Sequence, residues 1–172
     1  SLFYAEDLMD EPFVCCYSDC LFTANLVSST IATAGEIVVS VDTGWRERYA
    51  DRTEHPTDDA EKITASDGVV TRIDREIPEA EAYGEFTGVA RFGKSGAEVL
   101  RRAYHRIREG HAGQPFRGAK LFEKAYLIHL LQEMIEDGVE FRHSDTGGEY
   151  IEIDTQQDFE YARGCWENGG IA

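Results

Sequence analysis

Short apolar runs alternate with amphipathic stretches along this chain. Residues 13–17, 36–41 and 149–153 are rich in β-branched and aromatic side chains and are bounded by polar residues. Runs of this length and composition predict buried strands. Between the first two runs, residues 23–34 carry apolar side chains at helical spacing and end before Gly35, which predicts a helix. A strand, a helix and a second strand in this order are typical of a parallel sheet.

The middle of the chain predicts a hairpin. Residues 62–65 and 69–73 are β-prone, and the Asp-Gly pair at 67–68 between them suits the positive φ angles of a tight turn. We expect this hairpin to project beyond the main sheet. The other predicted elements are strands over residues 85–92 and 139–143 and helices over 1–10, 95–109, 120–137 and from 155 onward. Together the elements predict an α/β fold, with a mostly parallel central sheet flanked by helices and a small antiparallel hairpin.

Size and charge narrow the classes of function. The 172 residues fit a single domain, and no apolar run approaches the length that spans a membrane. The first residues carry no basic region typical of a signal peptide, so a cytoplasmic protein is expected. The chain has 33 acidic and 17 basic residues, and the net charge of −16 would repel nucleic acid. An anionic substrate would therefore need a local positive pocket or a metal ion.

The cysteines and histidines do not predict a metal or nucleophile site. The four cysteines form no paired C-x-x-C motif and have no histidine nearby, so they are expected to be buried, reduced thiols. The five histidines are scattered, and none has the spacing of a metal ligand or of a Ser/His/Asp triad.

Three predicted strands are each followed by an aspartate: Asp19, Asp42 and Asp154. In open α/β sheets ligands bind outside the carboxyl ends of the strands. Carboxylates there are the hard oxygen ligands that Mg²⁺ prefers when it carries phosphates. The sequence therefore predicts a nucleotide or phosphate site. Asp42 precedes Thr43 and Gly44 and is better explained as a turn former.

Four segments resemble motifs of nucleotidyltransferases of the sugar-phosphate and choline-phosphate type. Residues 147–162 read GGEYIEIDTQQDFEYA and resemble the closing motif of that family, approximately w-x-E-I-D-t-x-x-D-l-x-x-A. Residues 17–22 (YSDCLF), 60–63 (AEKI) and 84–92 (GEFTGVARF) resemble its s-D-x-x-f, a-E-K-v and g-E-f-x-G-l-x-x-f segments. The nearest likeness, which includes residues 127–135, is to cytidylyltransferase-like domains often associated with phosphoenolpyruvate mutase in phosphonate pathways.

One family motif has no counterpart. The family begins with a Gly-rich loop, approximately L-A-A-G-x-G-x-R-L, followed by a Pro-Lys and two strand–helix units. The chain resembles the C-terminal two-thirds of such proteins, so residues 1–172 are expected to form a single, N-terminally incomplete nucleotidyltransferase domain. Because the loop would hold the triphosphate through its backbone N–H groups, these residues alone are expected to be inactive.

The resemblance implies a Mg²⁺-dependent nucleotidyltransferase. It would transfer a nucleotidyl group, from CTP by the nearest likeness, to a phosphate or phosphonate acceptor and release pyrophosphate. Asp19 and Asp154 would bind Mg²⁺. Lys62 would contact the acceptor phosphate or the transferring phosphate, and Glu85 and Glu152 would bind the acceptor. The net charge and the short apolar runs predict no nucleic-acid or membrane partner, and a homodimer is a further expectation.

Four of these residues also have a structural alternative. Asp19 suits a turn after a strand, and Asp154 suits a helix cap, for which Thr155 competes. Lys62 and Glu152 would otherwise be solvent-exposed residues of strands.

Two other classes of function stay open from the sequence. A metal-dependent glycosyltransferase also places acidic metal ligands at strand ends. A non-catalytic nucleotide-binding or regulatory domain would keep the fold without the reaction.

Overall fold

A computed structural model describes residues 2–50, 52–54, 56–167 and 171. The strands are β1 (Phe13–Cys16), β2 (Cys20–Phe22), β3 (Ile37–Asp42), β4 (Lys62–Ser66), β5 (Val69–Asp74), β6 (Gly84–Phe92), β7 (Arg142–Thr146) and β8 (Tyr150–Glu152). The α-helices are α1 (Ala24–Ala32), α2 (Trp45–Tyr49), α3 (Lys94–His111), α4 (Leu127–Glu136) and α5 (Gln156–Glu167). Short 3₁₀ helices are η1 (Leu2–Leu8), η2 (Thr57–Asp59) and η3 (Phe122–Lys124).

The main sheet is mostly antiparallel, so the prediction of a mostly parallel sheet is wrong. Its strand order is β1-β6-β3-β7-β5-β4, and a further pairing of β4 with β6 closes the last five strands into a ring. Among the described strand pairs of this sheet only β3 and β7 run parallel. The crossover through α1 does give β1 and β3 the same direction, but β6 lies between them and is antiparallel to both.

The predicted hairpin is confirmed, whereas its expected position is wrong. β4 and β5 pair antiparallel, and the turn residues Asp67 and Gly68 have φ angles of 53° and 77°. Both angles are positive, as a two-residue hairpin turn of the Asp-Gly type requires. The hairpin does not project beyond the sheet, because β4 pairs with β6 and β5 pairs with β7 through Val69 and Arg142.

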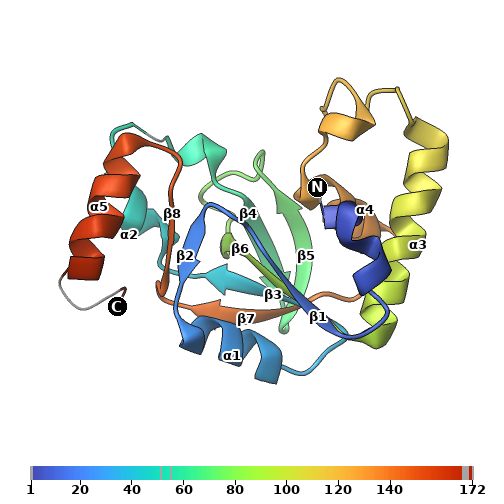
Figure 1. The fold of residues 1–172 in the computed structure, drawn as a ribbon. Coiled ribbons are helices and arrows are strands. Elements are labelled where there is room, and N and C mark those ends of the chain that lie inside the picture. The colour runs from blue at the N-terminus through green and yellow to red at the C-terminus, as the bar shows by residue number, and fades with distance from the viewer. Residues whose placement is uncertain (1, 51, 55, 168–170, 172) are drawn as a thin grey trace.

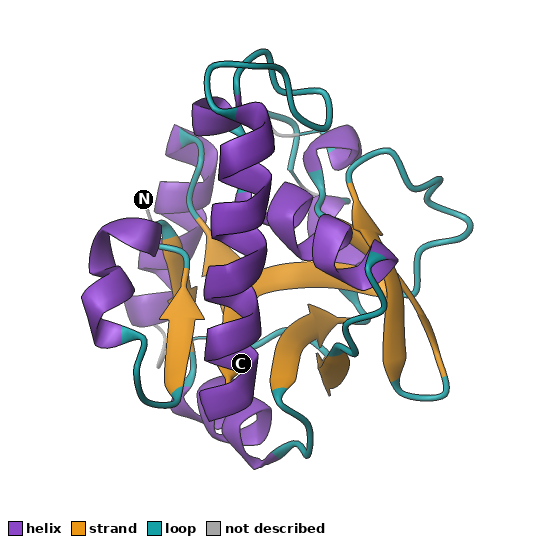
Figure 2. Cartoon of the chain, turned by 90° about the vertical axis from the view of Figure 1, so that its right-hand side faces the viewer, coloured by secondary structure: helices purple, strands orange, loops and turns teal. Residues whose placement is uncertain are grey.

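The largest core lies between the sheet and the pair of helices α3 and α4. Sheet residues such as Val39 and Phe92 pack there with Leu100 of α3 and Leu131 of α4. Figure 1 shows α3 and α4 on one side of the sheet and α2 and α5 on the opposite side, with α1 beneath β7. Figure 2, viewed from the side of α3, shows that helix running along the outside of the molecule.

Several element boundaries differ from the sequence prediction. The first helix is the 3₁₀ helix η1, which is interrupted at Ala5 (φ −101°, ψ 17°). The helix expected over residues 120–137 begins only at Leu127, after η3 and a loop. The strand expected over residues 139–143 is β7, three positions later in the chain.

Three elements were not predicted at all. α2 and η2 lie between residues 43 and 60, where no element was predicted, and β2 follows β1 after a turn. In the described part of the chain no helix has the length and apolar character needed to cross a membrane.

Candidate functional site

A short antiparallel ladder between β2 and β8 carries the two carboxylates predicted to bind metal. Cys20 of β2 pairs with Glu152 of β8. Asp19 precedes β2, Asp154 follows β8, and the backbone N–H of Ile153 donates to the carbonyl oxygen of Asp19 at 2.9 Å. The structure therefore brings Asp19 and Asp154 to the same end of the ladder. They meet because the residue entering one antiparallel strand lies beside the residue leaving the other, not because parallel strand ends converge.

The helix cap after β8 is made by Thr155 and Asp158, as the sequence predicted. The Oδ2 atom of Asp158 accepts from the backbone N–H of Thr155 at 2.9 Å, and the Thr155 hydroxyl accepts from the N–H of Asp158 at 3.2 Å. This reciprocal pattern is a capping box. The side chain of Asp154 is thus not needed as the cap of α5.

Arg52 joins this end of the ladder to the loop after α2. Its Nε lies 2.8 Å from Oδ1 of Asp158, and its Nη2 lies 3.7 Å from Oδ2 of Asp154. Burial raises the pKa of Asp158, but the hydrogen bonds from Arg52 and Thr155 outweigh it and lower that pKa to about 2. The neighbouring backbone N–H of Thr53 also donates to Gln157 at 2.9 Å, so the loop is fastened to the start of α5.

Glu85 lies deep in the molecule and is held by two tyrosines. The hydroxyls of Tyr49 and Tyr150 donate to its two carboxylate oxygens, each at 2.7 Å. Burial raises the pKa of Glu85, which these hydrogen bonds and nearby arginines only partly offset. The tyrosine hydrogen bonds leave lone pairs unused on the Glu85 carboxylate, so Glu85 can still accept a hydrogen bond from a ligand.

Lys62 is buried, so its alternative reading as an exposed strand lysine is wrong. It lies opposite Glu85 in the pairing of β4 with β6. Its Nζ donates to the carbonyl oxygens of Thr57 at 3.4 Å and Ala60 at 3.3 Å. Within the described part of the chain no carboxylate forms an ion pair with Lys62, and one of its three N–H donors remains for a ligand.

Glu61 was not singled out from the sequence, although it lies within the segment that resembles a-E-K-v. It is buried, accepts a hydrogen bond from the Tyr17 hydroxyl at 2.9 Å and pairs with Arg75 at 3.3 Å. Burial raises its pKa. The only sequence signal for Glu61 was its place beside Lys62 in that motif.

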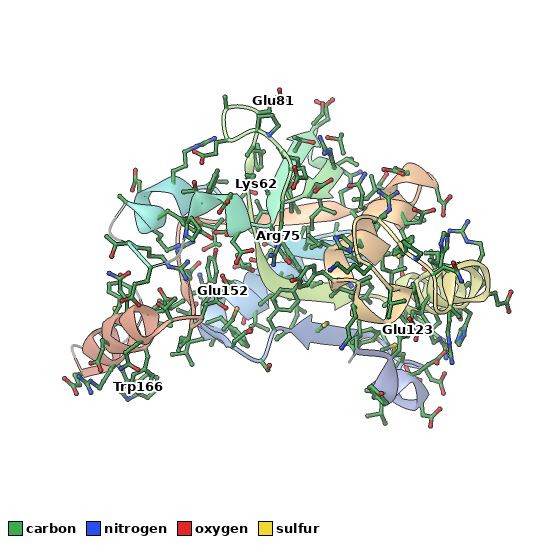
Figure 3. The ribbon with its side chains drawn as sticks, turned by 90° about the horizontal axis from the view of Figure 1, so that it is seen from above. Lys62, Arg75, Glu81, Glu123, Glu152 and Trp166 are labelled. Atoms are coloured by element: carbon green, nitrogen blue, oxygen red, sulfur yellow. The ribbon has the colours of Figure 1, made fainter. Side chains whose placement is uncertain are left out.

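Glu152 lies near the carboxylates of Asp154, Glu85 and Glu61. Its pKa is raised to about 8, first by burial and then by the negative charges of Asp154, Glu85 and Glu61. Among the described residues none donates a hydrogen bond to its carboxylate. Figure 3 shows Glu152, Arg75 and Lys62 around one central region, far from Trp166 and Glu123 at the two ends.

The donor set at the ladder fits a magnesium ion that also carries phosphates. In the described part of the chain no group of three or more His, Cys, Asp or Glu side chains is placed to hold a metal ion. Mg²⁺ bound to substrate phosphates needs only one or two protein carboxylates and keeps several waters. Asp19 and Asp154 supply such a pair, and both are exposed enough to reach a substrate.

Asp42 is the turn former predicted from the sequence. Its Oδ1 accepts from the backbone N–H of Gly44 at 2.9 Å, and its carboxylate forms an ion pair with Arg48. The prediction that all four cysteines are buried is wrong for Cys16, which is exposed, whereas Cys20 is buried within the ladder. The cysteines are all free thiols.

A cavity of about 510 Å³ lies between α5 and residues 147–151. Its lining contains none of the five predicted site residues, but it includes Tyr150, whose hydroxyl donates to Glu85.

Comparison with known proteins supports the resemblance seen in the sequence. No family model matches the chain. It is 24% identical over 171 residues to the CTP:phosphoglutamine cytidylyltransferase of Campylobacter jejuni subsp. jejuni serotype O:2. The match covers 93% of this chain and 64% of that protein, so the chain spans slightly less than two-thirds of its relative.

Solved structures show the same fold. The inositol-1-phosphate CTP transferase from T. maritima superposes with a TM-score of 0.64 at 19% identity, over 91% of this chain and 55% of that one. A putative glucose-1-phosphate thymidylyltransferase from Bacillus anthracis gives a TM-score of 0.61 at 10% identity, over 95% and 58% of the two chains. A nucleoside-diphosphate-sugar pyrophosphorylase from Vibrio cholerae RC9 gives 0.54 at 16% identity, over 87% and 55%. The chain is thus similar in sequence to a cytidylyltransferase and shares its fold with nucleotidyltransferases of known structure.

Proposed function

We propose that the protein containing this chain is a Mg²⁺-dependent cytidylyltransferase. The acceptor's phosphate or phosphonate oxygen would attack the α-phosphorus of CTP, the bond from that phosphorus to the β-phosphate oxygen would break, and pyrophosphate would leave. One observation supports the proposal: Asp19 and Asp154 lie at the same end of the ladder of β2 and β8, near a group of buried carboxylates. The similarity to cytidylyltransferases supports CTP as the donor.

Asp19 and Asp154 are the residues that would hold the metal ion. A bound Mg²⁺ would neutralise charge on the phosphate oxygens and fix their orientation. The protein's own contribution would be to keep the two carboxylates at the same end of the ladder, and the Asp19–Ile153 backbone hydrogen bond and the capping box of α5 support this role. Phosphoryl chemistry of this kind depends on positioning and electrostatic stabilisation rather than on a covalent group.

Lys62, Glu85 and Glu152 would bind the acceptor. The third N–H of the Lys62 ammonium group is the donor that would contact an acceptor phosphate or phosphonate. Glu85 and Glu152 present acceptor oxygens for a hydroxyl or amino group on the same molecule. Residues 1–172 would all belong to one nucleotidyltransferase domain, while a cytoplasmic location and a homodimer stay predictions.

Release of pyrophosphate tests the proposal. The protein that contains this chain is incubated with Mg²⁺, with each of CTP, UTP, GTP and ATP, and with phosphocholine, aminoethylphosphonate, hydroxyethylphosphonate or sugar phosphates. Release that depends on CTP and on one acceptor class supports the proposal. Binding of a nucleotide without release, in every combination, would instead favour a non-catalytic domain. In a parallel incubation with a nucleotide-sugar, transfer of the sugar without release of pyrophosphate would favour a glycosyltransferase.

A further inference from the structure

Three arginines lie around the carboxylate site, and each forms at least one ion pair with an acidic side chain. Arg48 pairs with Asp42 and stacks on a tyrosine ring, its Cζ lying 4.1 Å from the centroid of Tyr150. Arg75 pairs with Asp59 and Glu61. Neither of these two arginines forms an ion pair or a hydrogen bond with Asp19 or Asp154 among the described residues.

Arg52 is different, because it lies beside Asp154 and only one of its nitrogens makes a hydrogen bond. Nε donates to Asp158 at 2.8 Å. Nη2 is buried and makes no hydrogen bond, since its separation of 3.7 Å from Asp154 is too long for one. Nη1 makes no hydrogen bond with any described residue either, and it is not buried. The side chain is 16% exposed, so the guanidinium edge that carries Nη1 reaches solvent.

The position of this free edge is fixed by packing. The guanidinium lies 5.0 Å from the ring centroid of Tyr49, whose hydroxyl binds Glu85. Its charge acts on the pKa values of both Glu85 and Glu152. A cation with unused donors is thus held among the carboxylates of the site.

We propose that Arg52 is a catalytic residue that contacts the α-phosphate of the nucleotide. The inference rests on the proposed function. A phosphate oxygen that shares a cation with Asp154 lies beside that carboxylate and therefore beside the free N–H groups of Arg52. A guanidinium suits this role because its planar fork can bind two phosphate oxygens at once. Charge that develops on the phosphate during transfer would be stabilised by a donor already in place.

The alternative is a structural role, in which Arg52 serves only to neutralise Asp158. The two roles are distinguished by making Arg52→Gln both in the wild-type protein and in the Asp158→Asn variant. Arg52→Gln alone removes the arginine but leaves Asp158 buried without its partner. Asp158→Asn combined with Arg52→Gln removes both charges, and Asn retains an oxygen that can serve in the capping box.

The experiment measures pyrophosphate release and, without acceptor, the Kd for Mg·CTP by calorimetry. Relative to Asp158→Asn, the double variant should lose about 100-fold in kcat and bind Mg·CTP about tenfold more weakly. Arg52→Lys should retain more activity than Arg52→Gln, because a positive charge remains. Arg163→Gln is the matched control, since Arg163 is an exposed arginine of α5 that pairs with Glu160, and it should match wild type.

The outcomes distinguish the two proposals. A wild-type protein that releases no pyrophosphate and binds no Mg·CTP overturns the proposed function. An active wild type whose double variant equals Asp158→Asn, in both kcat and Kd, overturns only the role of Arg52.

Discussion

The core under α3 and α4 and the ladder of β2 and β8 are built in opposite ways. Core residues such as Val39, Leu100 and Leu131 are 0–1% exposed, and they are joined by long strands and helices. The ladder has three residue pairs, and Leu21 at its centre is 40% exposed. Burial of apolar surface stabilises the first region. Hydrogen bonds and ion pairs to distant segments hold the ladder in place. Charged side chains can therefore cluster there with little loss of stability.

This contrast separates stability from function. Changes in the core should lower the free energy of unfolding, whereas changes at the ladder should lower activity and leave folding almost intact. The following substitutions test that separation.

The largest effect is expected for Asp154→Asn. The amide keeps the shape of the carboxylate but cannot neutralise Mg²⁺ charge, so pyrophosphate release should fall by about 10²-fold or more. The melting temperature should stay within a few degrees of wild type, because Thr155 and Asp158 cap the helix. Asp7→Asn, at an exposed position of η1, is the control. Near-normal turnover of Asp154→Asn in saturating Mg²⁺ would rule out the metal role.

Leu100→Ala should be the most destabilising change. Leu100 is fully buried in the core, and truncation there removes apolar contacts and leaves a cavity. A loss of about 2–5 kcal/mol in the free energy of unfolding is expected from chemical denaturation. Leu21→Ala in the ladder removes the same atoms from an exposed site and should cost less than about 1 kcal/mol. Equal losses would contradict the proposed division between the two regions.

Glu85→Gln should change how stability depends on pH. Burial raises the pKa of Glu85 in the folded protein above its value in the unfolded chain. The folded state therefore binds the proton more tightly, so this contribution is fully present below the unfolded pKa of about 4.5 and is lost as pH rises through the folded pKa. The Gln variant lacks this titration.

The measurement is denaturant unfolding at pH 4 and pH 8. The difference in free energy of unfolding between the variant and wild type should favour the variant more at pH 8 than at pH 4. Exposed Glu109, at the end of α3, provides the control substitution Glu109→Gln. If the two variants respond to pH alike, Glu85 does not titrate as its burial requires.

Gly68→Ala should have the smallest effect. Gly68 has a φ of 77° in the hairpin turn, which an L side chain adopts only with strain. A loss of about 1 kcal/mol in unfolding free energy is expected, with unchanged pyrophosphate release. A large loss of activity would show that the hairpin turn takes part in the site.

Much of the core was predictable from local pattern. The apolar run of β3 and the Asp-Gly turn of the hairpin are local signals, and both were predicted correctly. The sheet direction was not predictable, because the strand–helix–strand pattern does not reveal that β6 lies between β1 and β3. α2 was missed because its charged surface hides the buried pair Trp45 and Tyr49, which lie four residues apart.

The site was predictable only where a motif marked it. Motifs pointed to Asp19 and Asp154, and the structure places these two together. Glu61 was passed over although a motif contained it, and Arg52 carried no motif. The role proposed for Arg52 depends on α5, about a hundred residues later in the chain, whose Asp158 binds it. A local sequence pattern cannot predict a contact between residues so far apart in the chain.

The central claim is that the β2–β8 ladder builds a metal site from Asp19 and Asp154. Anomalous diffraction from crystals of the protein that contains this chain, grown with Mn²⁺ and CTP, tests it most directly. The account predicts one Mn²⁺ peak within about 2.2 Å of a carboxylate oxygen from both Asp19 and Asp154, with phosphate oxygens completing its coordination. A Mn²⁺ ion bound to the nucleotide but to neither carboxylate would contradict the account.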